Sequence, residues 1–395
     1  MAKNGIRDKV AIVGMGCTRF GELWDRSTED MLVEAVSDCL ASAKGITAED
    51  VDAYWLGTMD SGYSGLTLST ALKTRGKPVT RVENLCASGS ESLRGAVYAV
   101  ASGAYDVAMA VGVEKLKDSG FSGLTRHDPP DDGTSAETTA PAAFSYLAPA
   151  YQAAYGLDEA TMRKTLSHIA AKNHANGAKN PRAQFRTPMS EDAVSSSPLV
   201  AGNLGVLDCS GVADGAAAAL VVRAEDAYKY TDTPMFVKAL SLVAGAGTSM
   251  LDDEASFASL PEVTACVADA YSEAGISDPR TEISLAEVHD CFTPTELVLM
   301  EDLGFSDRGQ AWRDVLNGTF DADGSLPVNI DGGLKSFGHP IGATGLRMMF
   351  ECWLQFRGEA GERQLENPTI GLTHNLGGRP GRCVCFVGIV GKELS

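Results

Sequence analysis

The same order of short apolar segments and helical segments occurs in both halves of this 395-residue chain, and that order constrains its fold most strongly. In the first half, apolar runs too short for helices predict buried strands at residues 10–13, 51–56 and 107–111. Helical spacing of apolar residues predicts helices over 28–43 and from a turn at 84–88 to about residue 102. Strands that alternate with helices predict an α/β fold, with a mixed or mostly parallel sheet covered on both faces.

The second half repeats this order with different residues. GITAEDVDAYWLGTM at 45–59 is similar to GISDPRTEISLAEVHD at 275–290, since each has a helix end, an acidic linker and a strand. GHPIGATGLRMMFECWLQFRG at 338–358 repeats a small-residue turn that opens a helix, and a strand is expected after it at 369–373. The run at 215–222, with the pattern of a buried helix-to-strand piece, closes the first half. We therefore predict two similar halves packed against each other.

Residues 118–204 interrupt this pattern. From 118 to 149 the chain is rich in Gly, Pro, Asp, Ser and Thr and has no hydrophobic period, which is typical of a functional or mobile excursion. A helical pattern returns at 159–176, and the basic loop KNPRAQFR follows at 179–186. The predicted organisation is an N-terminal half (1–117 and 205–228), a loop-domain excursion (118–204) and a C-terminal half (229–395).

The charge and the cysteine content disfavour several kinds of partner. A formal net charge of -19 argues against nucleic acid and anionic membranes, which both require a basic face. No apolar run approaches the ~20 residues of a membrane span, and the start of the chain lacks a signal-peptide pattern. Nine scattered cysteines favour reduced thiols in the cytoplasm. The pair Cys383 and Cys385 lies in an apolar strand pattern, so no metal site is expected.

One cysteine stands apart from the apolar runs. Cys86 lies in VENLCASGSESLRG, after a short polar turn and at the start of a predicted helix. Unpaired N–H groups and the helix dipole favour an anion there, which predicts a lowered thiol pKa and a nucleophilic sulfur. The small residues that follow leave room for a substrate carbonyl. A structural thiol is the alternative for a lone cysteine.

Three further stretches carry polar side chains that could act with Cys86. VHDCFTPTE places His289 and Cys291 after a predicted strand, and their i, i+2 spacing puts both on one face of an extended chain. GGLKSFGHPIGATG places His339 in a glycine-rich loop that opens a helix. HNLGGRPG, which begins at His374, combines a strand end with a turn that has free backbone N–H groups. For each of these histidines taken singly, a structural role is the alternative.

With these motifs in this order, the chain resembles the thiolase superfamily, and within it the sterol-carrier-protein-type and archaeal acetoacetyl-CoA thiolases. The resemblance covers nearly the whole chain and rests on RVENLCASGSESLRGAVYAVASGAYD, GVEKLKDSGFSGL, HDCFTPTE, GGLKSFGHPIGATG and HNLGGRPG. It implies a thiolase fold, with two βαβ-rich halves in a five-layer α-β-α-β-α arrangement. It also implies acetyl-CoA C-acetyltransferase activity: condensation of two acetyl-CoA to acetoacetyl-CoA and CoA, or the reverse thiolysis, through an acyl-cysteine.

The resemblance implies a role for each matching residue. Cys86 is the nucleophile that takes the acyl group, His339 accepts its proton and lines an oxyanion site, and Cys291 is the acid/base thiol. Many thiolases place that thiol in a C-terminal C-x-G motif, where this chain has HNLGG. His289 stands where those relatives carry the asparagine of an N-E-A-F motif, and it helps to hold the second thioester oxygen. The other oxyanion contacts are expected from backbone N–H groups of Cys86 and of Gly377 or Gly378, with support from Asn375.

CoA thioesters are the implied substrates, with no cofactor and no metal. Their phosphates require a locally basic site despite the acidic chain, and the basic side chains of the excursion are the candidates. A solvated loop is the alternative for each of them. The expected CoA contacts are Lys172, Lys179, Arg182, Arg186 and Ser210.

Related functions stay open at this point. A 3-ketoacyl-CoA thiolase for longer or branched acyl chains is one, and a thiolase-like retro-aldolase, which is expected to lack the nucleophile set, is another. A decarboxylating ketoacyl synthase would carry a histidine in place of Cys291, and a non-catalytic acyl-CoA-binding scaffold is the alternative from a different class. The resemblance also implies a homodimer or tetramer. The archaeal relatives imply a complex with a hydroxymethylglutaryl-CoA synthase and a small OB-fold, zinc-ribbon protein.

Overall fold

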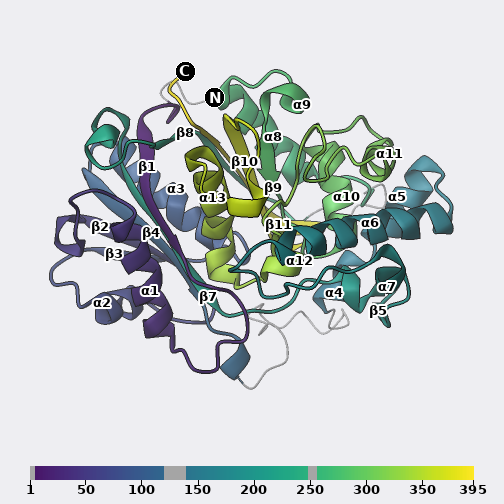
Figure 1. The fold of residues 1–395 in the computed structure, drawn as a ribbon, viewed down its shortest axis with the longest axis horizontal. Helices are drawn as coiled ribbons and strands as arrows, with labels where there is room; N and C mark the ends of the chain where they lie inside the picture. Colours follow the sequence, from purple (N-terminus) through teal and green to yellow (C-terminus); the bar gives the residue numbers. More distant parts are fainter. Residues whose placement is uncertain (1–4, 120–138, 248–255) are drawn as a thin grey trace.

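The strands of both halves join into one mixed sheet (Figure 1). The computed structural model describes residues 5–119, 139–247 and 256–395. Nine strands lie in the order β3-β2-β4-β7-β1-β8-β11-β10-β9. Their bounds are β1 (Val10–Cys17), β2 (Ala53–Gly57), β3 (Val79–Val82), β4 (Val107–Glu114), β7 (Gly215–Arg223), β8 (Met235–Ala244), β9 (Leu285–Glu287), β10 (Ile370–Arg379) and β11 (Arg382–Gly391).

The two halves of the sheet meet along a short seam. β1 pairs with β7 over most of its length, but with β8 through the two pairs Ala11↔Phe236 and Ile12↔Met235. Pairing is parallel between β2 and its neighbours β3 and β4, and between β9 and β10. The pairs that involve β7, β8 or β11 are antiparallel. This short seam divides the sheet into two strand sets, β3-β2-β4-β7-β1 in the first half and β8-β11-β10-β9 in the second. Each set is covered by its own helices.

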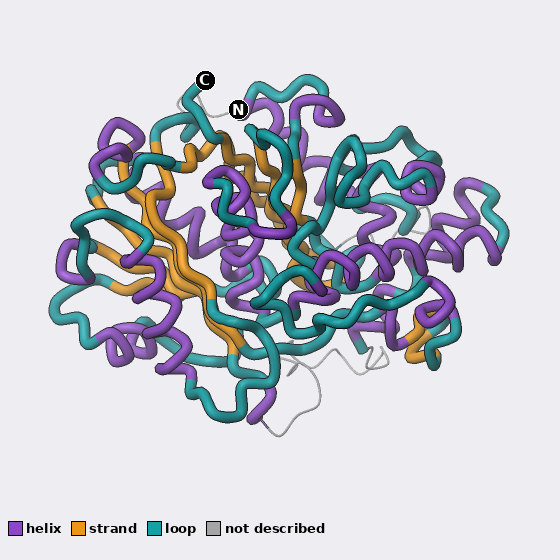
Figure 2. Tube along the Cα trace, in the orientation of Figure 1, coloured by secondary structure: helices purple, strands orange, loops and turns teal. Residues whose placement is uncertain are grey.

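Helices form three layers around the two strand sets. Figure 1 and Figure 2 show α3 (Ser88–Ala101) and α13 (Ile341–Arg357) between the sets, where they pack on each other. Leu93, Val97, Met349 and Trp353 from these helices share one buried cluster with strands of both halves. α1 (Thr28–Ala41) covers the first set from outside, and α8 (Pro261–Ala274) covers the second. This order is the five-layer α-β-α-β-α arrangement of the thiolase fold.

The remaining elements surround these layers. Within the described residues, no helix combines the length and apolar character that a membrane crossing needs. Part of the excursion, residues 120–138, lies outside the described residues, and the limits expected for the halves and the excursion stay a prediction. The other elements are α2 (Leu66–Leu72), α4 (Ala140–Phe144), α5 (Leu147–Tyr155), α6 (Glu159–Ala178), α7 (Glu191–Ser195), β5 (Leu199–Ala201), β6 (Leu204–Gly205), α9 (Pro279–Glu282), α10 (Thr293–Asp302), α11 (Ala311–Leu316) and α12 (Gly333–Phe337).

One local prediction differs from the structure. The run at 215–222, expected to be part helix, is strand throughout as β7. Its alanines suit a helix by propensity, but every residue from Gly215 to Val222 is buried in the middle of the sheet, so tertiary packing decides. The HNLGGRPG motif is a strand end followed by a turn, as expected: β10 runs to Arg379, and Pro380 and Gly381 form the turn before β11.

α3 and α13 begin where their backbones touch. A Cβ at Gly342 would lie 2.5 Å from two carbonyl oxygens, one on β2 and one on β4, and a Cβ at Gly89 would lie 2.6 Å from Gly342 O. Such distances exclude any side chain, so glycine is required for the contact. Because Cys86 precedes α3 and His339 precedes α13, this contact draws the two residues together.

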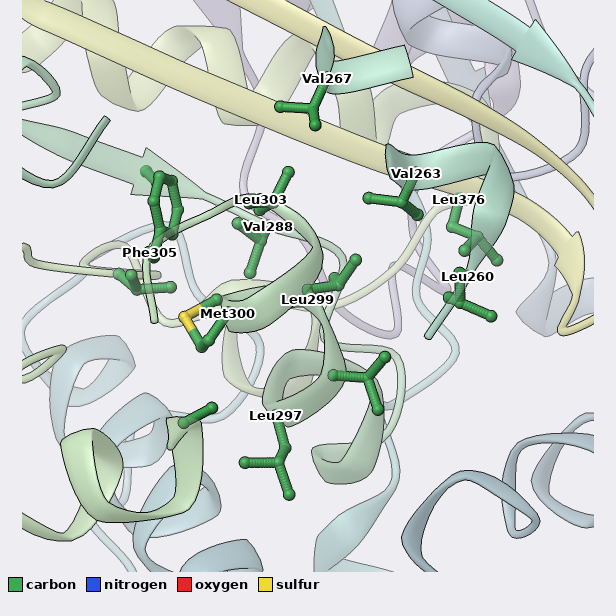
Figure 3. Close-up of a cluster of buried hydrophobic side chains, with 14 of the residues drawn as sticks. Leu260, Val263, Val267, Val288, Leu297, Leu299, Met300, Leu303, Phe305 and Leu376 are labelled. Carbon is green, nitrogen blue, oxygen red and sulfur yellow. The ribbon is translucent and has the colours of Figure 1, made fainter. Parts of the chain in front are cut away.

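A second contact region holds the segment that follows β9. All ten residues of α10 are buried. Figure 3 shows Val288, which directly precedes His289, in one apolar cluster with Leu299 and Leu303 of α10. Full burial of one such side chain contributes about 1.5–3 kcal/mol. The cluster therefore holds Val288, directly before His289, against α10.

We expect Gly342→Ala to destabilise the protein by about 1–3 kcal/mol, because the added methyl group meets backbone oxygens that cannot move independently. Chemical denaturation followed by far-UV circular dichroism measures this change. Ser37→Ala on the exposed side of α1 is the control and should be nearly neutral. Equal stability of the two variants would contradict the proposed contact.

Candidate active site

Cys86 lies in a tight turn between β3 and α3. Leu85, directly before it, has a φ of 51°, in the left-handed region that non-glycine residues rarely adopt. The Ser88 hydroxyl fixes this turn, since it accepts from Asn84 N at 2.9 Å and donates to Leu85 O at 2.6 Å. The turn holds the half-buried Cys86 two residues before the start of α3.

The prediction of a lowered pKa for Cys86 is wrong. Burial raises the pKa of the Cys86 thiol to about 12, and the negative charge of Glu114 acts in the same direction. The backbone N–H of Gly378 opposes this effect without overcoming it. Desolvation of a thiolate at this depth outweighs the attraction of the helix start. Cys86 is therefore a thiol at rest and needs a base to take its proton.

His339 has a nitrogen that can take this proton. Its Nδ1 lies 2.7 Å from Thr344 Oγ1, and the same hydroxyl donates its hydrogen to Pro340 O at 3.0 Å. Nδ1 must therefore carry the ring hydrogen, which leaves a lone pair on Nε2. Nε2 is buried and has no hydrogen-bond partner among the described residues. Burial lowers the pKa of His339 to about 3, with Arg347 acting in the same direction, so the ring is neutral.

His289 reaches the same point from the end of β9. Its ring meets that of His339 edge-on, with centroids 5.5 Å apart. One side-chain donor atom each from Cys86, His289 and His339 lies within 4.8 Å of the other two. Burial lowers the pKa of His289 well below its ordinary value, and His339 and His374 act in the same direction. Both histidines next to Cys86 are therefore neutral.

Cys291 reaches the site from the start of α10. Its Sγ lies 3.7 Å from Thr295 Oγ1, and its carbonyl oxygen accepts from Ser210 N at 2.8 Å. Burial raises the pKa of Cys291 well above its ordinary value, and the nearby Cys86 acts in the same direction. Like Cys86, this residue is a thiol at rest.

β10 passes against the Cys86 turn. A Cβ at Gly377 would lie 2.2 Å from a carbonyl oxygen of that turn, so the two backbones touch. The N–H of Gly378 lies at the Cys86 sulfur. Asn375 Oδ1 accepts from Ser90 Oγ at 2.6 Å, which ties β10 to α3. The structure thus brings one residue of the first half together with His289, Cys291, His339 and the β10 glycines of the second half.

Asp290 also belongs to this site, although its sequence pattern alone did not predict a role for it. Its carboxylate accepts from Leu334 N at 2.6 Å, from Lys335 N at 3.3 Å and from Asn173 Nδ2 at 2.8 Å. A Cβ at Gly333 would lie 2.3 Å from Asp290 Oδ2, so glycine there admits the carboxylate to the start of α12. Asp290 therefore links the segment of His289 and Cys291 to the helix that precedes His339. The signal was present in HDCF, where Asp290 separates the two candidates.

A buried carboxylate anchors the other side of the site. Glu114, at the end of β4, accepts from Thr58 Oγ1 at 2.9 Å, from Ser61 N at 2.9 Å and from Gly342 N at 3.1 Å. It therefore joins the loop after β2 to the start of α13. The GVEK stretch carried this residue, but nothing in its sequence pattern distinguishes a buried acceptor from a surface acid.

Two of the expected CoA contacts are engaged inside the protein. Lys172 is buried, and its ammonium pairs with Glu296 at 2.8 Å and donates to Val328 O at 2.8 Å. Arg182 donates to Cys17 O at 2.6 Å and lies over the Phe350 ring, 5.4 Å from its centroid. Lys172 therefore does not fit a contact with a phosphate, because leaving Glu296 would bury an unpaired charge.

The other three expected contacts differ in position. Lys179 and Arg186 are exposed, and Ser210 is half-buried beside Cys291. Lys179 lines a cavity of about 330 Å³ with Asn176 and Arg363. That cavity is not lined by Cys86, Cys291 or the site histidines, so proximity to the reacting atoms favours Ser210 over Lys179.

Comparison with known families agrees with this arrangement. Residues 10–225 match “Thiolase, N-terminal domain”, and residues 244–385 match “Thiolase C-terminal domain-like”. The chain belongs to the thiolase family. Both matched families meet at the site, since the first contains Cys86 and the second contains His289, Cys291 and His339.

Curated thiolase-family relatives match over nearly the whole chain. “Acetyl-CoA acetyltransferase” of Methanothermobacter thermautotrophicus is 39% identical over 96% of this chain and 98% of its own length. The protein of the same name from Methanocaldococcus jannaschii is 37% identical over 95% and 97%. Human “Sterol carrier protein 2” is 32% identical over 93% of this chain and 70% of its own length.

Solved structures share the thiolase fold. “Ltp2-ChsH2(DUF35) aldolase” has a TM-score of 0.82 and 23% identity, and the match covers 99% of both chains. A monomeric SCP2-thiolase like protein type 1 from Mycobacterium smegmatis has a TM-score of 0.77 and 18% identity, over 100% of this chain and 79% of that one. At this identity the likeness concerns the fold alone.

We expect Asp290→Asn to slow alkylation of Cys86 by iodoacetamide by ~100-fold. Loss of the Asp290 contacts would displace α12, and a shift of roughly 1 Å in His339, the expected proton acceptor, is enough to cause a loss of this size. In the variant, the asparagine side-chain nitrogen would replace Oδ2. It could not accept from Asn173 Nδ2 and Lys335 N, which now donate to Asp290 Oδ2. Peptide mass spectrometry of timed samples measures the rate at Cys86.

Asp302→Asn is the matched control for Asp290→Asn. Asp302 is also buried and accepts from Leu260 N at 2.7 Å, but it lies at the opposite end of α10 from Cys291. The control should lose stability and keep the alkylation rate. If both variants react as fast as the wild type, Asp290 does not position the site.

Proposed function

We propose that this chain is an acetyl-CoA C-acetyltransferase that joins two acetyl-CoA into acetoacetyl-CoA and CoA, or runs the reverse thiolysis. The observation that carries the proposal is the convergence of the Cys86 thiol with two neutral histidines, one of which, His339, has an unpaired Nε2 among the described residues. A second thiol, Cys291, lies near enough to Cys86 that burial and this neighbour together raise the pKa of Cys291. The full-length similarity to two proteins named acetyl-CoA acetyltransferase supports the same substrate.

The first half-reaction moves an acetyl group to Cys86. The Cys86 sulfur attacks the thioester carbonyl while His339 Nε2 takes its proton. Backbone N–H groups of Cys86 and Gly378, which lie at the Cys86 sulfur, are the candidate donors to the oxyanion. CoA leaves as a thiolate and takes a proton from Cys291. The products are acetyl-Cys86, CoA, an imidazolium at His339 and a thiolate at Cys291, so the charges balance.

The second half-reaction uses this ion pair. The Cys291 thiolate removes a proton from the methyl group of a second acetyl-CoA, and His289 and protonated His339 donate to the enolate oxygen. The enolate carbon attacks acetyl-Cys86, and the bond from sulfur to carbonyl carbon breaks. The departing Cys86 thiolate recovers its proton from His339. The buried, neutral resting site thus becomes charged only when substrate is bound.

Two related activities differ from the proposal in substrate. A 3-ketoacyl-CoA thiolase for longer or branched chains would use the same four residues, and rates on a series of 3-ketoacyl-CoA thioesters separate the two. A solved structure with a similar fold is an aldolase. A retro-aldolase is expected to lack the nucleophile set, whereas this chain has Cys86, Cys291 and His339. A non-catalytic scaffold would bind acyl-CoA without turning it over. Loss of acetoacetyl-CoA absorbance in the presence of CoA separates the proposed activity from the retro-aldolase and from the scaffold.

The proposal includes CoA thioesters as the sole small molecules of the reaction, with no cofactor. The exposed Lys179 and Arg186 are the candidate cations for its phosphates, and Ser210 is the candidate contact nearest the thioester. A cytoplasmic location and a role in supplying acetoacetyl-CoA to the mevalonate pathway belong to the same proposal.

We also propose a homodimer or tetramer, and a complex with a hydroxymethylglutaryl-CoA synthase and a small OB-fold, zinc-ribbon protein. β3 ends the sheet on the side of the first half, which leaves an edge for pairing. Multi-angle light scattering should report at least twice the 41.4 kDa mass of the chain. An active monomer at all concentrations would contradict the oligomer, and failure to co-purify with the two partners would contradict the complex.

Cys291→Ala should still accept an acetyl group on Cys86, because a thiolate with a pKa of about 8.5 in water can leave without an acid. Carbon–carbon bond formation should then fall by about 10²–10⁴-fold, since the base for the α-proton is lost. Quenched-flow labelling with radioactive acetyl-CoA, beside steady-state condensation, measures both steps. The expected signature is a burst of acetylation without turnover.

Two further variants serve as controls for this result. Cys86→Ser should show neither the burst nor turnover, and Cys209→Ala, at another half-buried cysteine, should retain both. Condensation at the wild-type rate in Cys291→Ala would assign the base to another group.

A further inference from the structure

We propose that Cys86, His289 and His339 form a binding site for a zinc-class divalent ion, and that the bound ion reversibly blocks Cys86. The three donors come from separate segments, so no motif with metal-ligand spacing in the sequence indicates the site. The block of activity rests on the proposed function of Cys86. The ion site itself rests on geometry and donor chemistry, which are independent of the reaction.

The donor atoms are already close to a coordination shell. One side-chain donor from each of Cys86, His289 and His339 lies within 4.8 Å of the other two. Tetrahedral zinc, with Zn–S of about 2.3 Å and Zn–N of about 2.0 Å, separates such donors by roughly 3.3–3.6 Å. Small rotations of the three side chains would cover this difference.

His339 and His289 each have a buried ring nitrogen that is available to bind a ligand. A metal-binding histidine normally donates its second ring N–H to a neighbour, which fixes both tautomer and orientation. Nδ1 of His339 donates to Thr344 Oγ1 at 2.7 Å, and its Nε2 is buried without a hydrogen-bond partner among the described residues. In the described part of the chain, His289 Nδ1 is also buried without one. Binding a cation would give these buried nitrogens the partner that they lack, and would therefore be favourable in free energy.

The donor set selects the ion. One thiolate and two imidazoles favour Zn²⁺ and Co²⁺, whereas Mg²⁺ and Ca²⁺ prefer oxygen ligands. Binding replaces the thiol hydrogen of Cys86 with the metal and releases one proton to solvent. Three protein ligands leave the fourth position to water. The sulfur lone pair that would attack a thioester is then held in the metal–sulfur bond, so the site cannot be acylated until the ion leaves.

Cobalt titration of the full chain tests the site without reference to activity. Co²⁺ bound to a thiolate in tetrahedral geometry gives a sulfur-to-metal charge-transfer band and strong visible bands. We expect one equivalent of Co²⁺ to produce both, Zn²⁺ to displace it and EDTA to abolish them. Mg²⁺ should have no effect.

Variants assign the ligands. Cys86→Ser should lose the charge-transfer band, and His289→Asn should weaken Co²⁺ binding by at least tenfold. Thr344→Val keeps the ligands but removes the acceptor for His339 Nδ1, and it should weaken binding by about 10–100-fold. Cys209→Ser is the matched control, since Cys209 is half-buried but its Sγ donates to Gly205 O at 3.4 Å. It should bind Co²⁺ as the wild type does.

The outcomes separate this inference from the proposed function. An unchanged charge-transfer band in Cys86→Ser, or no tetrahedral spectrum in the wild type, overturns the ion site. If Co²⁺ binds as expected but acetyl-CoA never labels Cys86, the site stands and the proposed function fails. If Zn²⁺ binds at Cys86 and acetylation proceeds at the same rate, the block is overturned. Acetylation that stops with Zn²⁺ and resumes with EDTA supports both parts.

Discussion

The backbone contact between the first turns of α3 and α13 is the constraint on which the site depends. Gly89 and Gly342 let the two helices start within van der Waals distance of each other and of the strands β2 and β4. Each helix belongs to a different half, and each is preceded by a reactive residue. A side chain at either glycine would separate Cys86 from His339 before it altered any reacting group. The position of the chemistry is therefore a consequence of packing between the two central helices.

Burial sets the protonation of the assembled site. It raises the pKa of Cys86 to about 12 and lowers that of His339 to about 3, so both are neutral at rest. A neutral thiol and a neutral imidazole can exchange one proton when a substrate stabilises the charges that result. These two donors, together with His289, can also bind a metal ion in place of the thiol proton. The proposed reactivity with thioesters and the proposed affinity for zinc both follow from one thiol beside two neutral imidazoles.

The family, the order of elements and the reactive segments were predictable from the sequence, because each motif is local. HDCF and the GHP loop identify His289, Cys291 and His339 wherever they come to lie. The direction of the Cys86 pKa was predicted wrongly, since a helix start is visible in the sequence and the depth of burial is not. Lys172 was misassigned for a related reason: its partner Glu296 is distant in sequence, and the ion pair forms only inside the fold.

The sequence by itself determined which side chains this protein has for chemistry and which elements carry them. Hydrophobic periodicity and glycine-rich turns are local properties, and they specify strands, helices and the turns before α3 and α13. Only the tertiary structure decided that Asp290 would cap α12, that Glu114 would receive the start of α13, and that three donors would converge within 4.8 Å. Those contacts join residues far apart in the chain, and their distances and desolvation depend on how the two halves pack.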